Sequence, residues 1–186
     1  MAQKIIDNDS LIAALFDVFR NRGYEGATLS QLSRVTGLQK SSLYHRFPAG
    51  KEDMARAVVL GVRSQLHAQI IEPLGDSAVA AEIRFANQIA RIREFYADGR
   101  KNCILNVLNL EGGDTEIRDM MRQDFDAWRD ALTALAEEKG VGHRQALQRA
   151  EHFLITLEGA LVIQRLTGDE HTLLRSLEHE QGRFFE

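Results

Sequence analysis

The chain has 186 residues, of which 44% are hydrophobic and 27% are charged, and its formal net charge is −4 at pH 7. These proportions are ordinary for a soluble globular protein with a real core. A single cysteine excludes an intrachain disulfide, and the lack of any apolar run of roughly 18 residues excludes a membrane-spanning helix.

We predict an all-α-helical chain. Its only prolines are Pro48 and Pro73, and no region shows the alternation of β-branched residues that is typical of strands. The N-terminal residues are too polar and too few to form a signal peptide. We therefore expect a cytoplasmic protein with no membrane partner.

Residues 28–36 are predicted to form the first of two short helices joined by a turn. Thr28 is followed three residues later by Gln31, which is the spacing of a capping box that satisfies free amides at a helix start. Gly37 follows, and glycine adopts the positive φ of a tight turn without steric cost. The residues expected to be buried, spaced three apart on one face, are Leu29, Leu32 and Val35.

The second short helix is predicted at about Gln39–Phe47, and it ends before Pro48. Leu43 and Phe47 lie four residues apart and are expected to form its buried face. A helix-turn-helix of this kind places its second helix in the DNA major groove. The side chains left toward solvent or DNA are Gln39, Lys40, Ser42, Tyr44, His45 and Arg46.

Together with the helix before it, this segment resembles the N-terminal domain of the TetR family of transcriptional repressors over roughly residues 8–56. Ser41 and Arg46 differ from the family's commonest residues, and Pro48-Ala49-Gly50 lengthens the following loop. These differences bear on the operator sequence rather than on the fold. The positions that agree in order and spacing are Phe16, Phe19, Gly23-Tyr24, Ala27-Thr28, Leu32-Ser33, Thr36-Gly37-Leu38, Leu43-Tyr44-His45, Phe47 and Lys51-Glu52.

The resemblance implies which side chains hold the DNA backbone. The Tyr44 hydroxyl is expected to contact a phosphate, with packing at the edge of the domain as the alternative for its ring. His45 is expected to contact a phosphate or a base edge. Thr28 and Lys51 lie at helix N-termini, where a side chain and backbone amides can hold a phosphate together.

Base edges are reached from the start of the second helix. Lys40 or Arg46 toward guanine and Gln39 toward adenine are chemically possible, and the sequence does not choose between them. The candidates at this end of the helix are Gln39, Lys40, Ser41 and Ser42.

The charge of the chain is unevenly distributed. Residues 1–56 contain eight Lys or Arg and six Asp or Glu, a balance of +2, whereas the remainder contains 15 and 21, a balance of −6. Positive charge is therefore concentrated where DNA is expected, which supports a DNA-binding role.

We expect residues 1–50 to form a three-helix DNA-binding domain and residues 51–186 to form a six-helix domain for effector binding and dimerisation, nine helices in total. Asp76 or Ser77 is expected to cap the second helix of the larger domain. Apolar periodicity and glycine breaks place the six helices at about 51–71, 77–98, 103–110, 115–139, 143–166 and around 173–177.

The family resemblance implies a small-molecule pocket in this larger domain. Trp128 is the strongest single candidate, because its indole N–H needs a partner if it is buried. The apolar faces of the predicted helices carry few charged residues, so we expect an apolar or aromatic effector. Each of these apolar residues could instead pack in an ordinary hydrophobic core. The candidate lining residues are Phe85, Ile89, Ile92, Phe95, Cys103, Leu105, Leu108, Met121, Phe125, Trp128, Phe153 and Leu157, with Asn106, Asn109, Glu158 and Gln164 as polar groups.

The resemblance also implies a homodimer in which the last two long helices pair with their copies. The helix at 143–166 has apolar or small residues on more than one face, so it must be covered on two sides. The alternative is a helix buried entirely within one chain. The residues expected at the dimer interface are Leu154, Leu157, Ala160, Leu161, Gln164, Leu173 and Leu177.

Cys103 follows Arg100 and Lys101 at a predicted helix start, an environment that favours a reactive thiolate. A thiol-based sensor of oxidants or electrophiles is therefore one alternative function, against an inert buried thiol. A second alternative is an architectural DNA-binding protein that takes a protein partner. The histidines show no metal-site spacing and no catalytic motif occurs, so we expect no metal, no cofactor and no enzymatic activity.

Overall fold

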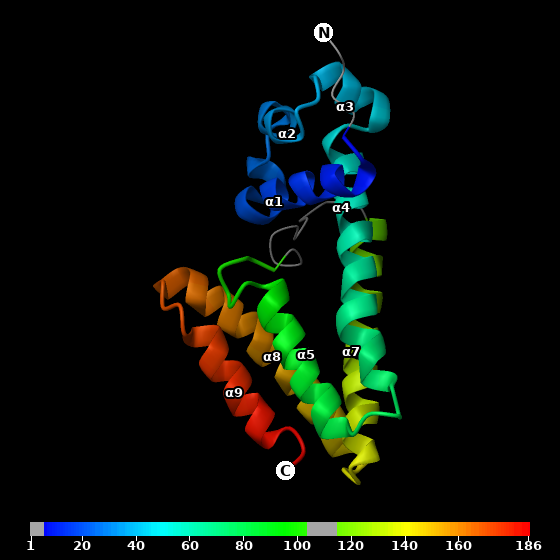
Figure 1. Cartoon of the computed structure of the whole chain (residues 1–186), viewed down its shortest axis with the longest axis vertical. Helices are drawn as coiled ribbons and strands as arrows, with labels where there is room; N and C mark the ends of the chain where they lie inside the picture. Colours follow the sequence, from blue (N-terminus) through cyan, green and yellow to red (C-terminus); the bar gives the residue numbers. More distant parts are fainter. Residues whose placement is uncertain (1–5, 104–114) are drawn as a thin grey trace. The chain divides into compact units, whose positions relative to one another are not determined.

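The computed structural model describes residues 6–103 and 115–186 (Figure 1). Within these residues the regular structure is entirely helical, which confirms the predicted all-α class. The short helix expected at 103–110 lies, apart from Cys103, outside the described residues. The eight α-helices described are α1 (Asn8–Gly26), α2 (Leu29–Thr36), α3 (Lys40–Arg46), α4 (Lys51–Leu66), α5 (Ala81–Phe95), α7 (Thr115–Glu138), α8 (His143–Thr167) and α9 (Thr172–Arg183).

The described residues divide into two compact units. The first comprises residues 6–64 and 115–118, and the second comprises residues 65–103 and 119–186. The first unit therefore includes most of α4, which the sequence assigned to the larger domain. No helix in the described ranges is long and apolar enough to cross a membrane.

The start of α2 confirms the predicted capping box. The Thr28 side chain accepts a hydrogen bond from the Gln31 amide at 3.3 Å, and the Gln31 side chain accepts one from the Thr28 amide at 3.2 Å. Two free amides at the helix start are thereby satisfied. At the other end Gly37 adopts φ 69° and ψ 8°, so a left-handed residue makes the turn into α3 as expected.

The inward face of α2 differs from the prediction. Val35 was expected to be buried, but it is exposed, and the buried residues are Leu32 and Thr36. The Thr36 hydroxyl can occupy this buried place because it donates to the Leu32 carbonyl at 2.8 Å and accepts from the Leu38 amide at 3.3 Å. A spacing of four therefore describes this face better than the spacing of three that predicted Val35.

The helix expected at 51–71 changes geometry before its end. After α4, His67–Ile71 forms one turn of π-helix, named η1, and Glu72–Gly75 forms a 3₁₀ turn, named η2. Pro73, within η2, has no amide hydrogen with which to continue a regular helical ladder. The predicted extent is therefore right, and the change of helix type was not foreseen.

Helix α5 is shorter than the predicted 77–98. Neither Asp76 nor Ser77 caps it, because the Asp76 carboxylate accepts from the Ala78 amide in a local turn and the N-cap residue is Ala80. At the other end Ala97 and Asp98 adopt φ of 48° and 53°, which is incompatible with continued right-handed helix.

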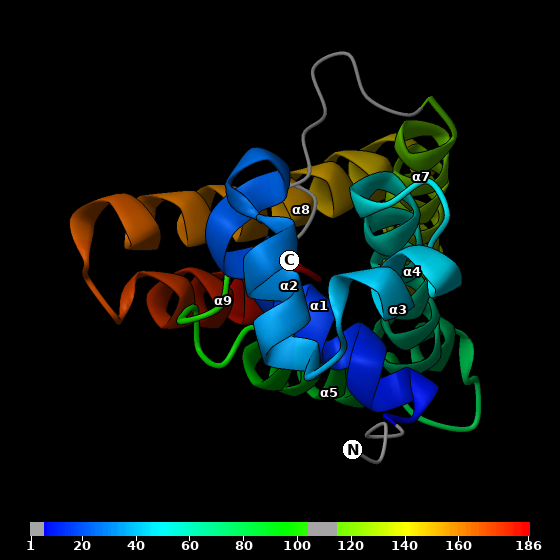
Figure 2. The same cartoon turned by 90° about the horizontal axis from the view of Figure 1, so that it is seen from above.

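Helices α8 and α9 form an antiparallel hairpin, with Gly168 in the left-handed conformation at the end of α8 (Figures 1 and 2). Phe85 of α5 stacks on Phe184, which follows α9, with a centroid distance of 4.1 Å. Phe153 of α8 packs edge-to-face with Phe85 at a centroid distance of 5.3 Å, and all three rings are buried. This aromatic cluster joins α5, α8 and the end of α9 into the core of the second unit.

Candidate functional site

Helix α3 presents a polar surface around one apolar anchor. Leu43 is fully buried and Phe47, directly after the helix, is almost fully buried. Because these two residues lie on one face, the remaining side chains turn outward. The exposed members of the predicted DNA-contact set on and around α3 are Gln39, Lys40, Ser41, Tyr44, His45 and Arg46, whereas Ser42 is half-buried.

The ring of Tyr44 packs beside the loop that leads into α4. A Cβ atom added at Gly50 would lie 3.1 Å from Cε1 of Tyr44, and Gly50 has φ +69°. Glycine is therefore favoured at position 50 both by backbone conformation and by the close approach of the ring. The Tyr44 side chain nevertheless remains 47% exposed, so packing and contact with a ligand are compatible.

Three other predicted DNA contacts have partners within the first unit. Arg46 donates to the Asn8 side chain at 3.0 Å, which ties α3 to the start of α1. The ammonium of Lys51 lies 4.3 Å from the centroid of the Tyr24 ring and 3.9 Å from a carboxylate oxygen of Glu25. Thr28 serves in the capping box. These side chains are held in place before any DNA is present.

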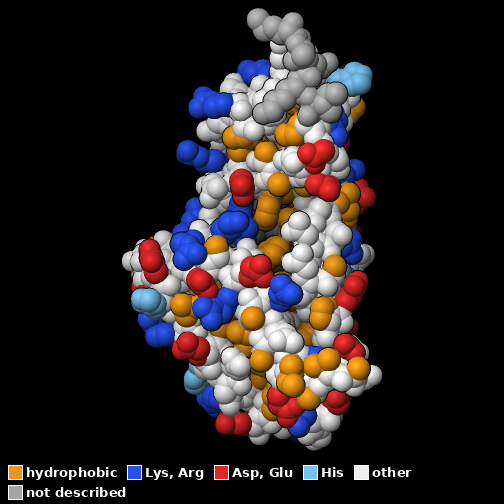
Figure 3. All heavy atoms as spheres, in the orientation of Figure 1, with side chains coloured by type: hydrophobic (Ala, Val, Ile, Leu, Met, Phe, Trp, Pro, Cys, Tyr) orange, Lys and Arg blue, Asp and Glu red, His pale blue; other side chains and the backbone are white. Residues whose placement is uncertain are grey.

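Burial is the main cause that raises the pKa of Tyr24 above its usual value, with the nearby carboxylates of Glu52 and Glu25 adding to the effect. The Tyr24 phenol is therefore uncharged at neutral pH, and the face of its ring attracts the Lys51 ammonium in a cation–π contact. Acidic and basic side chains are interspersed over the face shown in Figure 3. On this face, basic side chains therefore do not form a continuous basic surface.

In the second unit, most of the predicted effector-site residues lie in the core. Phe125 is an exception, because it is 39% exposed and turns away from the interior. The candidates Leu105, Asn106, Leu108 and Asn109 lie outside the described residues. Those that are buried are Phe85, Ile89, Ile92, Cys103, Trp128, Phe153, Leu157 and Gln164, while Phe95, Met121 and Glu158 are half-buried.

Asp124 takes the buried place on α7 that the sequence assigned to Phe125. Its carboxylate is almost fully buried, and its Oδ1 atom lies 2.8 Å from Nε2 of His67 in η1. A buried carboxylate needs such a partner, and this one is 57 residues away in the chain. Sequence reasoning missed the pair because apolar periodicity favours the phenylalanine.

Trp128 lies one helical turn after Asp124 on the same face of α7 and is 5% exposed. Its Nε1 atom has no hydrogen-bond partner among the described residues. Buried indole N–H groups usually have a hydrogen-bond partner, so the lack of one for Trp128 among the described residues is unusual.

Cys103 is buried, and its Sγ atom accepts a hydrogen bond from the Tyr96 hydroxyl at 3.6 Å. Its thiol is therefore shielded from solvent, as an inert buried cysteine would be.

The residues predicted at the dimer interface are buried within the single chain, so most of their side-chain surface is covered before a second copy binds. Gln164 shows why: its amide donates to the Asp98 carbonyl and accepts from the Leu173 amide, each at 2.9 Å. The buried set is Leu154, Leu157, Ala160, Leu161, Gln164, Leu173 and Leu177, and the exposed apolar residues of α8 are Ile155, Val162, Ile163 and Leu166.

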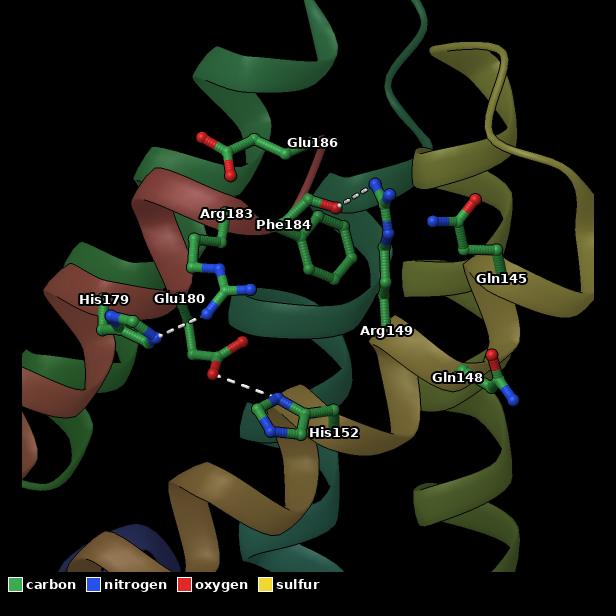
Figure 4. A pocket seen from close by; sticks show the side chains of 9 residues that line it. All are labelled: Gln145, Gln148, Arg149, His152, His179, Glu180, Arg183, Phe184 and Glu186. Carbon is green, nitrogen blue, oxygen red and sulfur yellow. Dashed lines mark hydrogen bonds and ion pairs between the residues drawn. The ribbon is translucent and has the colours of Figure 1, made fainter.

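A polar pocket of about 550 Å³ lies between α8 and α9 (Figure 4). Several of its polar side chains are already paired within the chain. His152 lies 3.1 Å from the buried carboxylate of Glu180, Arg149 donates to the Phe184 carbonyl, and Arg183 donates to His179. The contacts of His152 and Arg149 therefore connect α8 to α9 and to the residue that follows it.

Comparison with known proteins agrees with this geometry. A family model described as "Bacterial regulatory proteins, tetR family" matches residues 11–58, and one described as "Transcriptional regulator LmrA/YxaF-like, C-terminal domain" matches residues 78–179. The chain is 25% identical over 175 residues to an HTH-type transcriptional regulator of Mycobacterium tuberculosis, covering 89% of this chain and 87% of the relative. It is 23% identical over 162 residues to the regulator YxaF of Bacillus subtilis, covering 84% of each.

Among solved structures, a TetR transcriptional regulator from Legionella pneumophila superposes with a TM-score of 0.83 at 19% identity, covering 96% of this chain and 98% of that one.

Proposed function

Because the chain belongs to the TetR family of bacterial transcriptional regulators, we propose that it represses transcription as a homodimer on a palindromic operator and that a small apolar or aromatic effector releases it. The observation that carries the DNA-binding part is the outward face of α3, where polar side chains surround the buried Leu43 anchor. Such a helix fits the major groove and reads base edges from its N-terminal end.

The dimer surface in this proposal is the exposed stripe of α8. Ile155, Gly159, Val162 and Leu166 are spaced by three or four residues and share one face. Ile155 is 68% exposed and Leu166 is 79% exposed, which is unusual for large apolar side chains. Gly159 has open space where a Cβ would lie, so a second helix can approach closely. A second copy with the same stripe gives a two-fold interface.

Replacing Tyr44 with phenylalanine tests the DNA surface. We expect Tyr44→Phe to weaken binding to operator and to random duplex by a similar factor of about 5–10, because it removes one phosphate hydrogen bond and leaves the ring packed beside Gly50. The measurement is fluorescence anisotropy with both duplexes. Tyr24→Phe is the control, because Tyr24 is half-buried in the same unit, and it should leave both affinities unchanged. A loss confined to the operator would argue against a phosphate contact.

The effector in this proposal contacts Trp128 and accepts a hydrogen bond from its Nε1–H, which has no partner among the described residues. Asp124, one turn away, is hydrogen-bonded to His67, which directly follows α4. Because α4 runs from the DNA-binding unit to this point, a shift of Asp124 on effector binding can be passed to α4. Release of DNA requires that the effector bind the non-DNA-binding arrangement more tightly.

Trp128 is the only tryptophan, so its fluorescence reports directly on this site. We expect apolar or aromatic compounds that bind there to change its emission and to lower operator affinity by roughly 5–150-fold. In His67→Ala the emission should still change, whereas most of the loss of operator affinity should disappear.

The matched control is His143→Ala, because His143 forms a comparable but exposed pair with Glu137 at 2.7 Å. It should respond to the effector like the unmodified protein. Full effector-induced release in His67→Ala would rule out this route of coupling.

A further inference from the structure

A separate cavity of about 420 Å³ lies between the turns η1 and η2 and helix α5. Ile70, Pro73 and Leu74 supply an apolar wall. From α5 come Arg84 and Gln88, which are four residues apart and therefore share one face of the helix. Neither Trp128 nor Asp124 lines this cavity, so it is distinct from the effector site proposed above.

The side chain of Gln88 is only 3% exposed, and both its Nε2 and its Oε1 lack a hydrogen-bond partner within the part of the chain that the structure describes. Burying an amide without partners is costly, and native proteins rarely do so. Because the described residues give this side chain no hydrogen bond, its rotation into the adjoining cavity breaks no hydrogen bond with them. The side chain then offers one acceptor and two donors to an occupant.

The charged groups of the cavity are already neutralised. Arg84 is buried, donates through Nη1 to the Leu74 carbonyl and pairs through Nη2 with the Glu138 carboxylate. Arg91 pairs with Glu94 at 3.1 Å. No unpaired cation therefore remains among the lining residues to favour an ionised carboxylate or a phosphate. The Nε of Arg84 has no partner in the described residues and is one further donor.

We infer that this cavity binds a small neutral molecule with a planar cis amide, such as a lactam or a cyclic imide. The carbonyl of such a group accepts from Gln88 Nε2 while its N–H donates to Gln88 Oε1, so both halves of the unpartnered amide are satisfied together. The hydrocarbon part of the ligand lies against Ile70, Pro73 and Leu74. The π-helical turn η1 forms part of the wall, and single π turns often occur at functional sites.

The test is an NMR titration of the isotope-labelled full chain with δ-valerolactam. We expect it to shift the amide resonances of residues 69–72, of Leu74 and of α5. N-methyl-2-piperidone, which has the same ring without the N–H, should bind about tenfold more weakly, because Gln88 Oε1 again lacks a donor. Acetate, an ionised probe, should cause no shifts in these residues.

Gln88→Met should bind the lactam about tenfold more weakly than the unmodified chain. It should keep a melting temperature at or above that of the unmodified chain, because it removes an unpartnered amide and breaks no hydrogen bond. The matched control Gln181→Met, at an exposed position on α9 outside this cavity, should bind the lactam normally.

The inference is overturned if the lactam shifts none of these resonances at its highest soluble concentration. It is also overturned if the lactam binds Gln88→Met as well as the unmodified chain, or if acetate or the N-methyl compound binds as well as the lactam.

Discussion

The double substitution Ile155→Glu and Leu166→Glu is expected to convert the protein from a dimer to a monomer and to lower its affinity for a palindromic operator by about a thousandfold or more. Both side chains are exposed in the single chain, so glutamate at these positions costs the folded monomer little. In a two-fold interface, however, each substitution is present in both copies, so each would bury one carboxylate on either side of the interface.

The loss of DNA affinity follows because a monomer presents one α3 to one half-site. A dimer holds two such helices about 34–36 Å apart, and binding of the first makes binding of the second intramolecular. Analytical ultracentrifugation measures the oligomeric state, and anisotropy measures operator affinity.

Ile83→Glu is the matched control for the double substitution, because Ile83 is also a largely exposed isoleucine but lies on α5. It should leave the dimer and operator binding unchanged. A double variant that remains dimeric would mean that the exposed stripe of α8 is not the interface.

Replacing Phe85 with alanine is expected to lower the free energy of unfolding by about 3–5 kcal/mol. Phe85 is almost fully buried, stacks on Phe184 and packs edge-to-face with Phe153, so truncation leaves a cavity at the junction of three elements. The measurement is urea unfolding followed by circular dichroism. Phe125→Ala makes the same chemical change at an exposed site and should cost less than about 1 kcal/mol. Equal costs for the two variants would contradict the packing described for the second unit.

The DNA-binding part of the fold was predictable from sequence because its determinants are local. The capping box at Thr28 and the left-handed turn at Gly37 depend on residues within a few positions of each other. The same is true of the Leu43–Phe47 anchor, since four-residue spacing alone brings these side chains to one face. These features are confirmed, and only Val35 was assigned to the wrong side of its helix.

The second unit was less predictable because its polar interior depends on partners distant in sequence. Periodicity favoured Phe125, whereas Asp124 is buried because His67 reaches it from η1. The side-chain atoms of Trp128 and Gln88 that lack partners among the described residues are likewise properties of the packed structure, and no local pattern marks them.

The dimer surface shows a different limit of sequence reasoning. Helix α8 has two apolar faces, as predicted, but composition cannot tell which face covers the chain's own core. The structure buries the face of Leu157 and Leu161 and exposes that of Ile155 and Leu166. We therefore propose the exposed residues of α8, which apolar periodicity did not single out, as the surface that meets a second copy.

The central claim is that two copies read one symmetric DNA site through α3. Selection of bound duplexes from a randomised pool by the purified full-length protein tests it most directly. The predicted result is an enriched motif with two-fold symmetry, whose half-sites are centred about one helical turn apart, bound by two chains per duplex. Enrichment of a motif without symmetry, or binding of one chain per site, would contradict the account.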